Sequence, residues 1–122
     1  MNKYKRNYLP HKTYVAGITQ TGTAAPVATV REDNTGSNLG ASSPVLARTG
    51  AGVYTVTKTG LFPAGKTSAH ITNNVLADGS KATVERTSAN VLTIKTFDGS
   101  GAAADAVLGA GGVLMDLVIK LY

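Results

Sequence analysis

Apolar and polar residues alternate with a period of two along most of this chain. Between residues 13 and 21, Tyr14, Ala16 and Ile18 alternate with small or polar residues, and turn-forming residues follow. Such alternation, bounded by turn residues, predicts a β-strand that buries one face. The same pattern predicts further strands at 27–31, 45–49, 53–59, 67–72, 81–87 and 91–97.

Short connections between these segments predict antiparallel hairpins. Gly50-Ala51-Gly52 separates the third and fourth predicted strands, and Ser88-Ala89-Asn90 separates the sixth and seventh. Glycine and asparagine in so short a connection are typical of hairpin turns. Residues 32–44 and 98–105 consist mainly of small and polar residues and are predicted to form surface loops.

The chain ends in an apolar segment, 113–122, that is compatible with a helix or a strand by hydrophobicity alone. One face would carry Val113, Met115, Leu117, Ile119 and Leu121. The strict alternation and the preceding pair Gly111-Gly112 favour a long final strand. About eight closely spaced strands predict an all-β fold, an antiparallel β-sandwich or a jelly-roll-like domain.

The composition strengthens this prediction and excludes several kinds of site. Thr, Val and Ile number 32 of 122 residues, whereas Glu and Gln together number three. β-Branched residues favour strands, and straight-chain residues favour helices. The absence of cysteine excludes disulfides, thiolate zinc sites and cysteine nucleophiles. Because Ala and Gly supply much of the remaining chain, we expect a thin core that is helped by neighbouring subunits.

Positive charge is concentrated at the N-terminus of a chain whose net charge is +5. Residues 1–12 contain no acid, and they predict a basic anchoring arm attached to a β-sandwich body at 13–122. Its expected docking residues are the basic and apolar side chains Lys3, Tyr4, Lys5, Arg6, Tyr8, Leu9 and Lys12. The body adds no basic stripe, so a protein partner is favoured over nucleic acid. No apolar segment is long enough for a membrane span.

Residues 60–67, GLFPAGKT, match the phosphate-loop pattern G-x-x-x-x-G-K-[ST]. A phosphate loop needs a buried strand before it and a helix after it, whose N-terminus faces the phosphates. Here the preceding segment alternates like a half-exposed strand, and the following segment lacks helical periodicity. We therefore predict a connection between strands, with Lys66 facing solvent, and nucleotide binding remains a remote alternative.

Other residues with potential chemistry are scattered along the sequence. His11 and His70 are 59 positions apart without a third ligand at short spacing, which disfavours a zinc site. Asp98 and Asp105 flank a Gly-rich loop and could hold calcium, although solvated carboxylates are the favoured interpretation. No catalytic, cofactor-binding or metal-binding residue is predicted, no cofactor is expected, and the chain is not expected to be an enzyme.

Three segments carry a resemblance to a known group of proteins. The pattern consists of residues 14–34 (YVAGITQTGTAAPVATVREDN), the pair 47–50 (ARTG) and 52–55 (GVYT), and residues 60–67. It resembles a pattern in small structural proteins of tailed bacteriophages. These phages infect Bacteroidetes and include crAss-like phages. Members often have an aromatic residue, commonly Trp, before the Arg-Thr pair, where this chain has Ala47.

The resemblance implies a rigid, oligomeric β-rich building block of a virion, of a kind that occurs in head fibres, decoration proteins and tail-associated proteins. We therefore expect a head fibre or capsid-decorating subunit located in the virion, anchored to the capsid or another virion protein by residues 1–12. A homotrimer is favoured over a dimer. The alternative is a tail-associated receptor- or glycan-binding module using loops 32–44 and 98–105, which is disfavoured because both loops lack aromatic residues.

Overall fold

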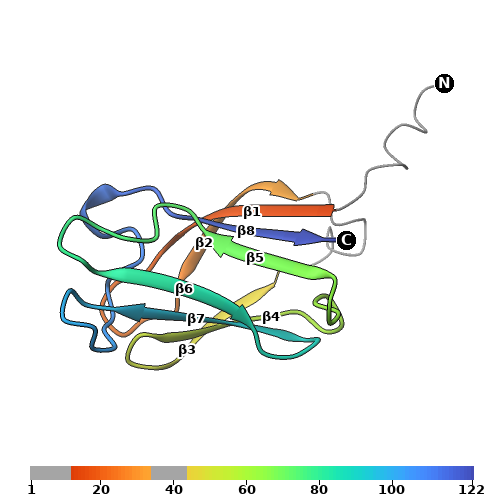
Figure 1. Ribbon diagram of the computed structural model, residues 1–122, viewed down its shortest axis with the longest axis horizontal. Helices are drawn as coiled ribbons and strands as arrows, with labels where there is room; N and C mark the ends of the chain where they lie inside the picture. The colour runs from red at the N-terminus through yellow and green to blue at the C-terminus, as the bar shows by residue number, and fades with distance from the viewer. Residues whose placement is uncertain (1–11, 34–43) are drawn as a thin grey trace.

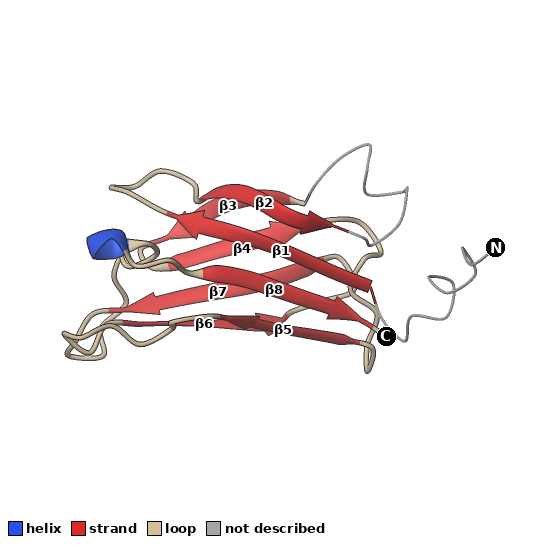
Figure 2. Ribbon diagram, turned by 90° about the horizontal axis from the view of Figure 1, so that it is seen from above, coloured by secondary structure: helices blue, strands red, loops and turns tan. Residues whose placement is uncertain are grey.

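The computed structural model describes residues 12–33 and 44–122, which form an antiparallel β-sandwich of eight strands (Figures 1 and 2). Sheet A has the strand order β2-β1-β8-β5, and sheet B has the order β3-β4-β7-β6. The strands are β1 (Lys12–Thr19), β2 (Val27–Asp33), β3 (Val45–Gly50), β4 (Val53–Thr57), β5 (Thr67–Ile71), β6 (Lys81–Arg86), β7 (Val91–Phe97) and β8 (Asp116–Leu121). A short 3-10 helix, η1 (Ala110–Gly112), precedes β8. The predicted all-β sandwich is confirmed.

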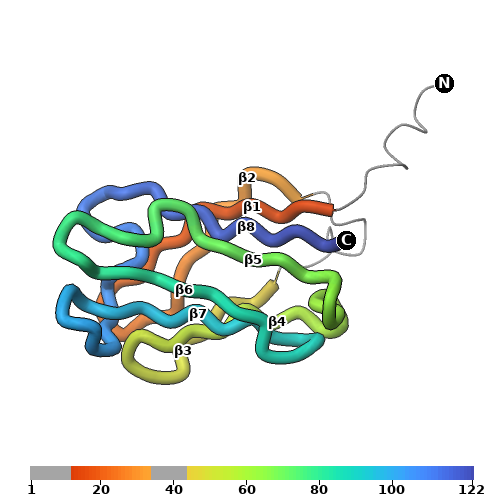
Figure 3. Tube along the Cα trace, viewed as in Figure 1, coloured from red at the N-terminus to blue at the C-terminus, as the bar shows by residue number. Residues whose placement is uncertain are grey.

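The strand order, which alternation could not predict, follows from where the chain crosses between layers. Three hairpins, β1–β2, β3–β4 and β6–β7, stay within one sheet, and the chain crosses after β2, β4, β5 and β7. Figure 3 traces the crossings that follow β4, β5 and β7, and β5 and β6 contact each other at one margin of the sandwich. No helix in the described part of the chain has the length and apolar character needed to cross a bilayer.

The core lies between the sheets and is built from the inward-facing residues of the central strands. Tyr14 pairs with Ile119 in sheet A, and Tyr54 pairs with Ile94 in sheet B. All four side chains are buried, as is Phe62 from the connection between β4 and β5. Burying an aliphatic or aromatic side chain of this size contributes about 1.5–3 kcal/mol. The largest fully buried side chains are Tyr14, Tyr54, Phe62, Ile18, Leu92, Ile94, Leu108, Met115, Leu117, Ile119 and Val56.

Several strands end or begin at other residues than predicted, because the backbone there forms hydrogen bonds within a turn and not with a neighbouring strand. The predicted strand 53–59 ends at Thr57, since Leu61 N–H donates to the Lys58 carbonyl in a turn. The final strand starts at Asp116 instead of 113, because the 3-10 turn uses residues 110–112. Its predicted inward face is confirmed by three buried residues, Met115, Leu117 and Ile119.

Candidate functional site

Most of the predicted docking residues lie outside the described part of the chain. These are Lys3, Tyr4, Lys5, Arg6, Tyr8 and Leu9, and His11 lies outside it as well. Lys12 is the exposed first residue of β1, where it pairs with Leu121 of β8. The first strand therefore begins one residue earlier than the predicted body. The arm remains a prediction.

Residues 60–67 form a connection between two strands, as the sequence analysis predicted. The connection leads from β4 to β5, and Thr67 is the first residue of β5. The Thr67 Oγ1 hydroxyl donates a hydrogen bond of 2.9 Å to the Pro63 carbonyl, and Lys66 is exposed. A strand follows the motif, so the helix N-terminus that would face bound phosphates is not present at this position. Leu61 and Phe62 instead anchor the connection in the core.

We expect neither the natural chain nor a Lys66→Ala variant to bind or hydrolyse ATP, because Lys66 has no phosphate-binding helix end beside it. The measurement is release of labelled phosphate from ATP with magnesium, together with filter binding of the nucleotide. Turnover that disappears in the Lys66→Ala variant would contradict this prediction and establish the remote nucleotide alternative.

Asp98 and Asp105 form hydrogen bonds with different parts of the protein. Asp98 Oδ1 accepts three hydrogen bonds from its own loop, from the Ser100 N–H (2.9 Å), the Ser100 hydroxyl (2.7 Å) and the Ala102 N–H (3.0 Å). These bonds lower the pKa of Asp98, with the Ser100 hydroxyl as the largest cause. The described residues contain no group of three or more metal-ligating side chains.

Asp105 is the centre of the densest polar cluster in the described body. Arg48 Nη2 donates to its Oδ2 at 2.8 Å, and Arg48 Nε lies 3.2 Å from both carboxylate oxygens. The Tyr54 hydroxyl donates to Oδ1 at 2.6 Å, and the Gly52 N–H donates to the same atom at 3.0 Å. The β3–β4 hairpin therefore surrounds a single carboxylate from a distant loop. We call the arrangement of Arg48, Gly52, Tyr54 and Asp105 the Asp105 clamp.

The hydrogen bonds of the Asp105 clamp lower the pKa of its carboxyl group and help to raise the pKa of its phenol. Donation from Arg48, and then from the Gly52 N–H and Tyr54, holds the pKa of Asp105 far below its ordinary value. Burial, followed by donation to Asp105, raises the pKa of Tyr54 to about 12. The carboxylate is therefore charged and the phenol neutral across the whole physiological range.

Gly52 must be glycine for the clamp to close. Its φ is +66°, a left-handed conformation that side chains disfavour. A Cβ at this position would lie 2.5 Å from the Thr96 carbonyl oxygen and 2.7 Å from the Ala104 nitrogen. The Ala104 N–H donates in turn to the Thr96 carbonyl, and the Thr96 hydroxyl donates to the Ala104 carbonyl. The hairpin turn and the Asp105 loop thus pack with no space between them.

Gln20 holds the other side of the same loop. Its side-chain amide donates to the Gly22 carbonyl at 2.9 Å and the Ala24 carbonyl at 3.0 Å. Its Oε1 accepts from the Ala106 N–H at 2.5 Å, next to Asp105. The predicted strand 13–21 ends at Thr19, because the Gln20 N–H donates to the Leu108 carbonyl of the loop and not to a neighbouring strand. The sequence analysis missed both Gln20 and the clamp.

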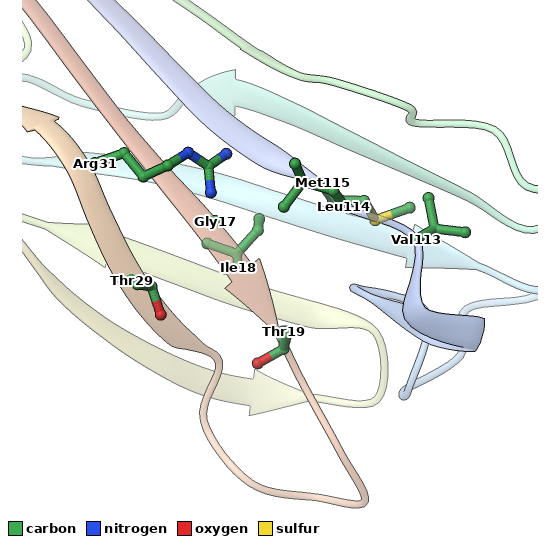
Figure 4. Close-up of a pocket in the computed structure, with 8 residues that line it drawn as sticks. All are labelled: Gly17, Ile18, Thr19, Thr29, Arg31, Val113, Leu114 and Met115. Carbon is green, nitrogen blue, oxygen red and sulfur yellow. The ribbon is translucent and has the colours of Figure 1, made fainter.

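A shallow groove of about 250 Å³ crosses the outer side of sheet A above Gly17 (Figure 4). The Arg31 side chain extends over Gly17 and forms an ion pair with Asp116, and a Cβ on Gly17 would lie 3.0 Å from Arg31 Nη1. Leu114, which is 57% exposed, forms the apolar side of the groove. The Arg31–Asp116 pair cancels its own charge, so the groove offers no net attraction to an ion.

The arrangement of polar groups in the described body therefore serves mainly to hold its loops together. Gln20, Arg48, Gly52 and Tyr54 all fix the loop around Asp105. No family model matches this chain, and neither a curated protein nor a solved structure matches it.

Proposed function

We propose that this chain is a structural protein of a tailed-bacteriophage virion, a head fibre or capsid-decorating subunit. It assembles as a homotrimer, and residues 1–12 anchor it to the capsid or to another virion protein. The observation that carries the proposal concerns the segments that resemble phage structural proteins: their polar residues hold the fold together. Each of Gln20, Arg48, Gly52 and Tyr54 fixes one loop of the sandwich, so the resemblance concerns a scaffold.

A rigid sandwich suits display on a particle, because a displayed subunit needs a fixed shape and a point of attachment and no conformational change. In this proposal the arm, residues 1–12, attaches the subunit to its partner. Lys3, Lys5, Arg6 and Lys12 meet acidic groups of the partner, and the apolar side chains of the arm are buried on docking. Each of Tyr4, Tyr8 and Leu9 then contributes about 1.5–3 kcal/mol if fully desolvated.

Deleting residues 1–11, which leaves β1 whole, is expected to reduce incorporation into particles at least tenfold and to leave the unfolding temperature of the body unchanged. The reason is that the anchoring charges and apolar groups are removed while every described strand is retained. The measurement is the amount of protein per purified particle, with thermal unfolding followed by circular dichroism.

A triple variant, Lys3→Gln, Lys5→Gln and Arg6→Gln, separates charge from length and should also incorporate poorly. The matched control is Lys66→Gln, which removes one exposed positive charge from the body and should incorporate normally. Normal incorporation of the deleted chain would refute the anchoring role. A large fall in its unfolding temperature would show instead that the arm belongs to the folded body.

A further inference from the structure

Two hollows adjoin each other toward the end of the sandwich that is opposite to the start of β1. The first is the groove above Gly17. The second, of about 270 Å³, lies between the β5–β6 connection and η1 and is lined by Leu76, Ala77, Asp78, Ala110, Gly111 and Val113. Val113 lines both hollows. In Figure 1 the β5–β6 connection and η1 lie at the left end, and β1 begins at the right end. We call the two together the distal hollows.

The walls of the distal hollows are mainly apolar, and acidic residues lie beside them. Asp78 lines the second hollow, and a Cβ on Gly99 would lie only 2.3 Å from the Asp78 carbonyl oxygen, so the turn that contains Asp98 packs against it. Hydrogen bonds within their own turns lower the pKa of both carboxyl groups. Lys81, also at this end, lies 6.0 Å from the centroid of the Phe97 ring. Two charged carboxylates therefore border the second hollow.

We propose that the distal hollows bind residues 1–11, the part of the arm before β1, of another copy of this chain. This inference rests on the anchoring role of the arm in the proposed function, and it names a further copy as a partner of the arm. Residues 1–11 contain no acid, and their basic and apolar side chains are Lys3, Tyr4, Lys5, Arg6, Tyr8 and Leu9. The cations lie against the two carboxylates, and the apolar side chains fill the hollows, so charge and hydrophobicity are both complementary.

The reach of the chain selects another copy over the body to which the arm is attached. A strand rises about 3.3 Å per residue, so Gly17 and Thr19 lie roughly 17 and 23 Å along β1 from Lys12. The four residues from Tyr8 to Lys12 span at most about 14 Å when fully extended. The backbone at Tyr8 and Leu9 therefore stops short of both hollows in its own body. The hollows of a second copy can be approached without this limit.

The positions of the two contact surfaces determine the kind of assembly. Figure 2 shows η1 at one end of an elongated sandwich and the start of β1 at the other. A contact between two different surfaces of the same chain continues from copy to copy, and it gives an open filament unless the rotation closes a ring. Because the surfaces lie at opposite ends, we expect successive units to join end to end, as a fibre requires, whether the unit is one chain or the proposed homotrimer.

The test is sedimentation velocity of the full chain across a wide range of concentration, with and without an excess of a synthetic peptide of residues 1–11. The natural chain is expected to grow past three copies into a continuous series of larger species as the concentration rises. The peptide should occupy the distal hollows and return the chain to its smallest species. Added salt should weaken the association as well, because exposed charge pairs are screened.

Variants at exposed positions of the two hollows locate the contact. Ala77→Lys in the second hollow and Leu114→Lys in the groove should each weaken association at least tenfold, because the new charge meets the basic arm. Ala77→Glu should associate at least as strongly as the natural chain, which separates charge from size. The matched control is Ser68→Lys, an exposed position on β5 near the other end, which should associate like the natural chain. Circular dichroism establishes that each variant is folded.

The outcomes separate this inference from the proposed function. Association that is unchanged in Ala77→Lys and Leu114→Lys would overturn the distal hollows as the binding site. A natural chain that never grows past three copies, or a peptide that leaves the larger species intact, would overturn the contact between arm and hollows. In each case the arm keeps its anchoring role on the particle if its deletion still lowers incorporation, and loses that role if the deleted chain incorporates normally.

Discussion

Replacing Gly52 by alanine is expected to lower the free energy of unfolding by about 2–5 kcal/mol. Two costs add at this position. The residue would be held at a φ of +66°, and its Cβ would press on the Thr96 carbonyl and on Ala104, both of which are backbone groups that cannot rotate away. Urea unfolding followed by circular dichroism measures the change through the transition midpoint and its slope.

Gly60→Ala is the matched control for this substitution. Gly60 has a similar φ of +71°, but no heavy atom lies within 4 Å of the position that its Cβ would occupy. Gly60→Ala should therefore lower the free energy of unfolding only by the cost of the left-handed conformation, about 1 kcal/mol. An equal loss of stability in the two variants would show that the close packing of the hairpin turn on Ala104 contributes nothing.

Asp105→Asn is expected to destabilise the protein at neutral pH and to flatten the acid limb of its stability profile. The folded protein holds the pKa of Asp105 far below its ordinary 3.8, so below about pH 5 the unfolded chain binds more protons at this residue than the folded chain does. Stability from the clamp is thus complete above about pH 5 and declines as the pH falls through 4 and below. Urea unfolding at a series of pH values from 7 to 2.5 measures the difference between the two proteins.

Two features of the chain sharpen this experiment. Asp78 and Asp98 also have lowered pKa values, but both are retained in the variant, so the difference between the proteins isolates Asp105. Tyr54→Phe removes one donor and keeps the carboxylate, and it should cost about 1–3 kcal/mol while preserving much of the acid dependence. A stability difference between Asp105→Asn and the natural chain that stays constant down to pH 2.5 would argue against the clamp.

Alternation along the chain was sufficient to predict where each strand lies, apart from shifts at several ends, and which face the first and final strands bury. Met115, Leu117 and Ile119 face the core as the pattern of the final segment indicates, and the hairpins at 50–52 and 88–90 form where glycine and asparagine occur. These features depend on residues that are neighbours in sequence, because side chains alternate along any extended backbone and a short turn has few conformations.

The clamp could not be predicted in this way, because it joins residues that the sequence separates. Asp105 lies 57 positions from Arg48, and Gln20 lies 86 positions from Ala106. Before the fold is known, Asp105 is one more acid in a loop, and calcium binding and solvation compete as interpretations.

The amino-acid sequence by itself determined the all-β class, the number of strands and the inward faces of the first and final ones, since these follow from side-chain alternation and local turn preferences. The tertiary structure alone decided which strands are neighbours and that Asp105 is enclosed by the β3–β4 hairpin. The physical reason is that such contacts depend on the order in which the chain crosses between the sheets, and no local pattern records that order.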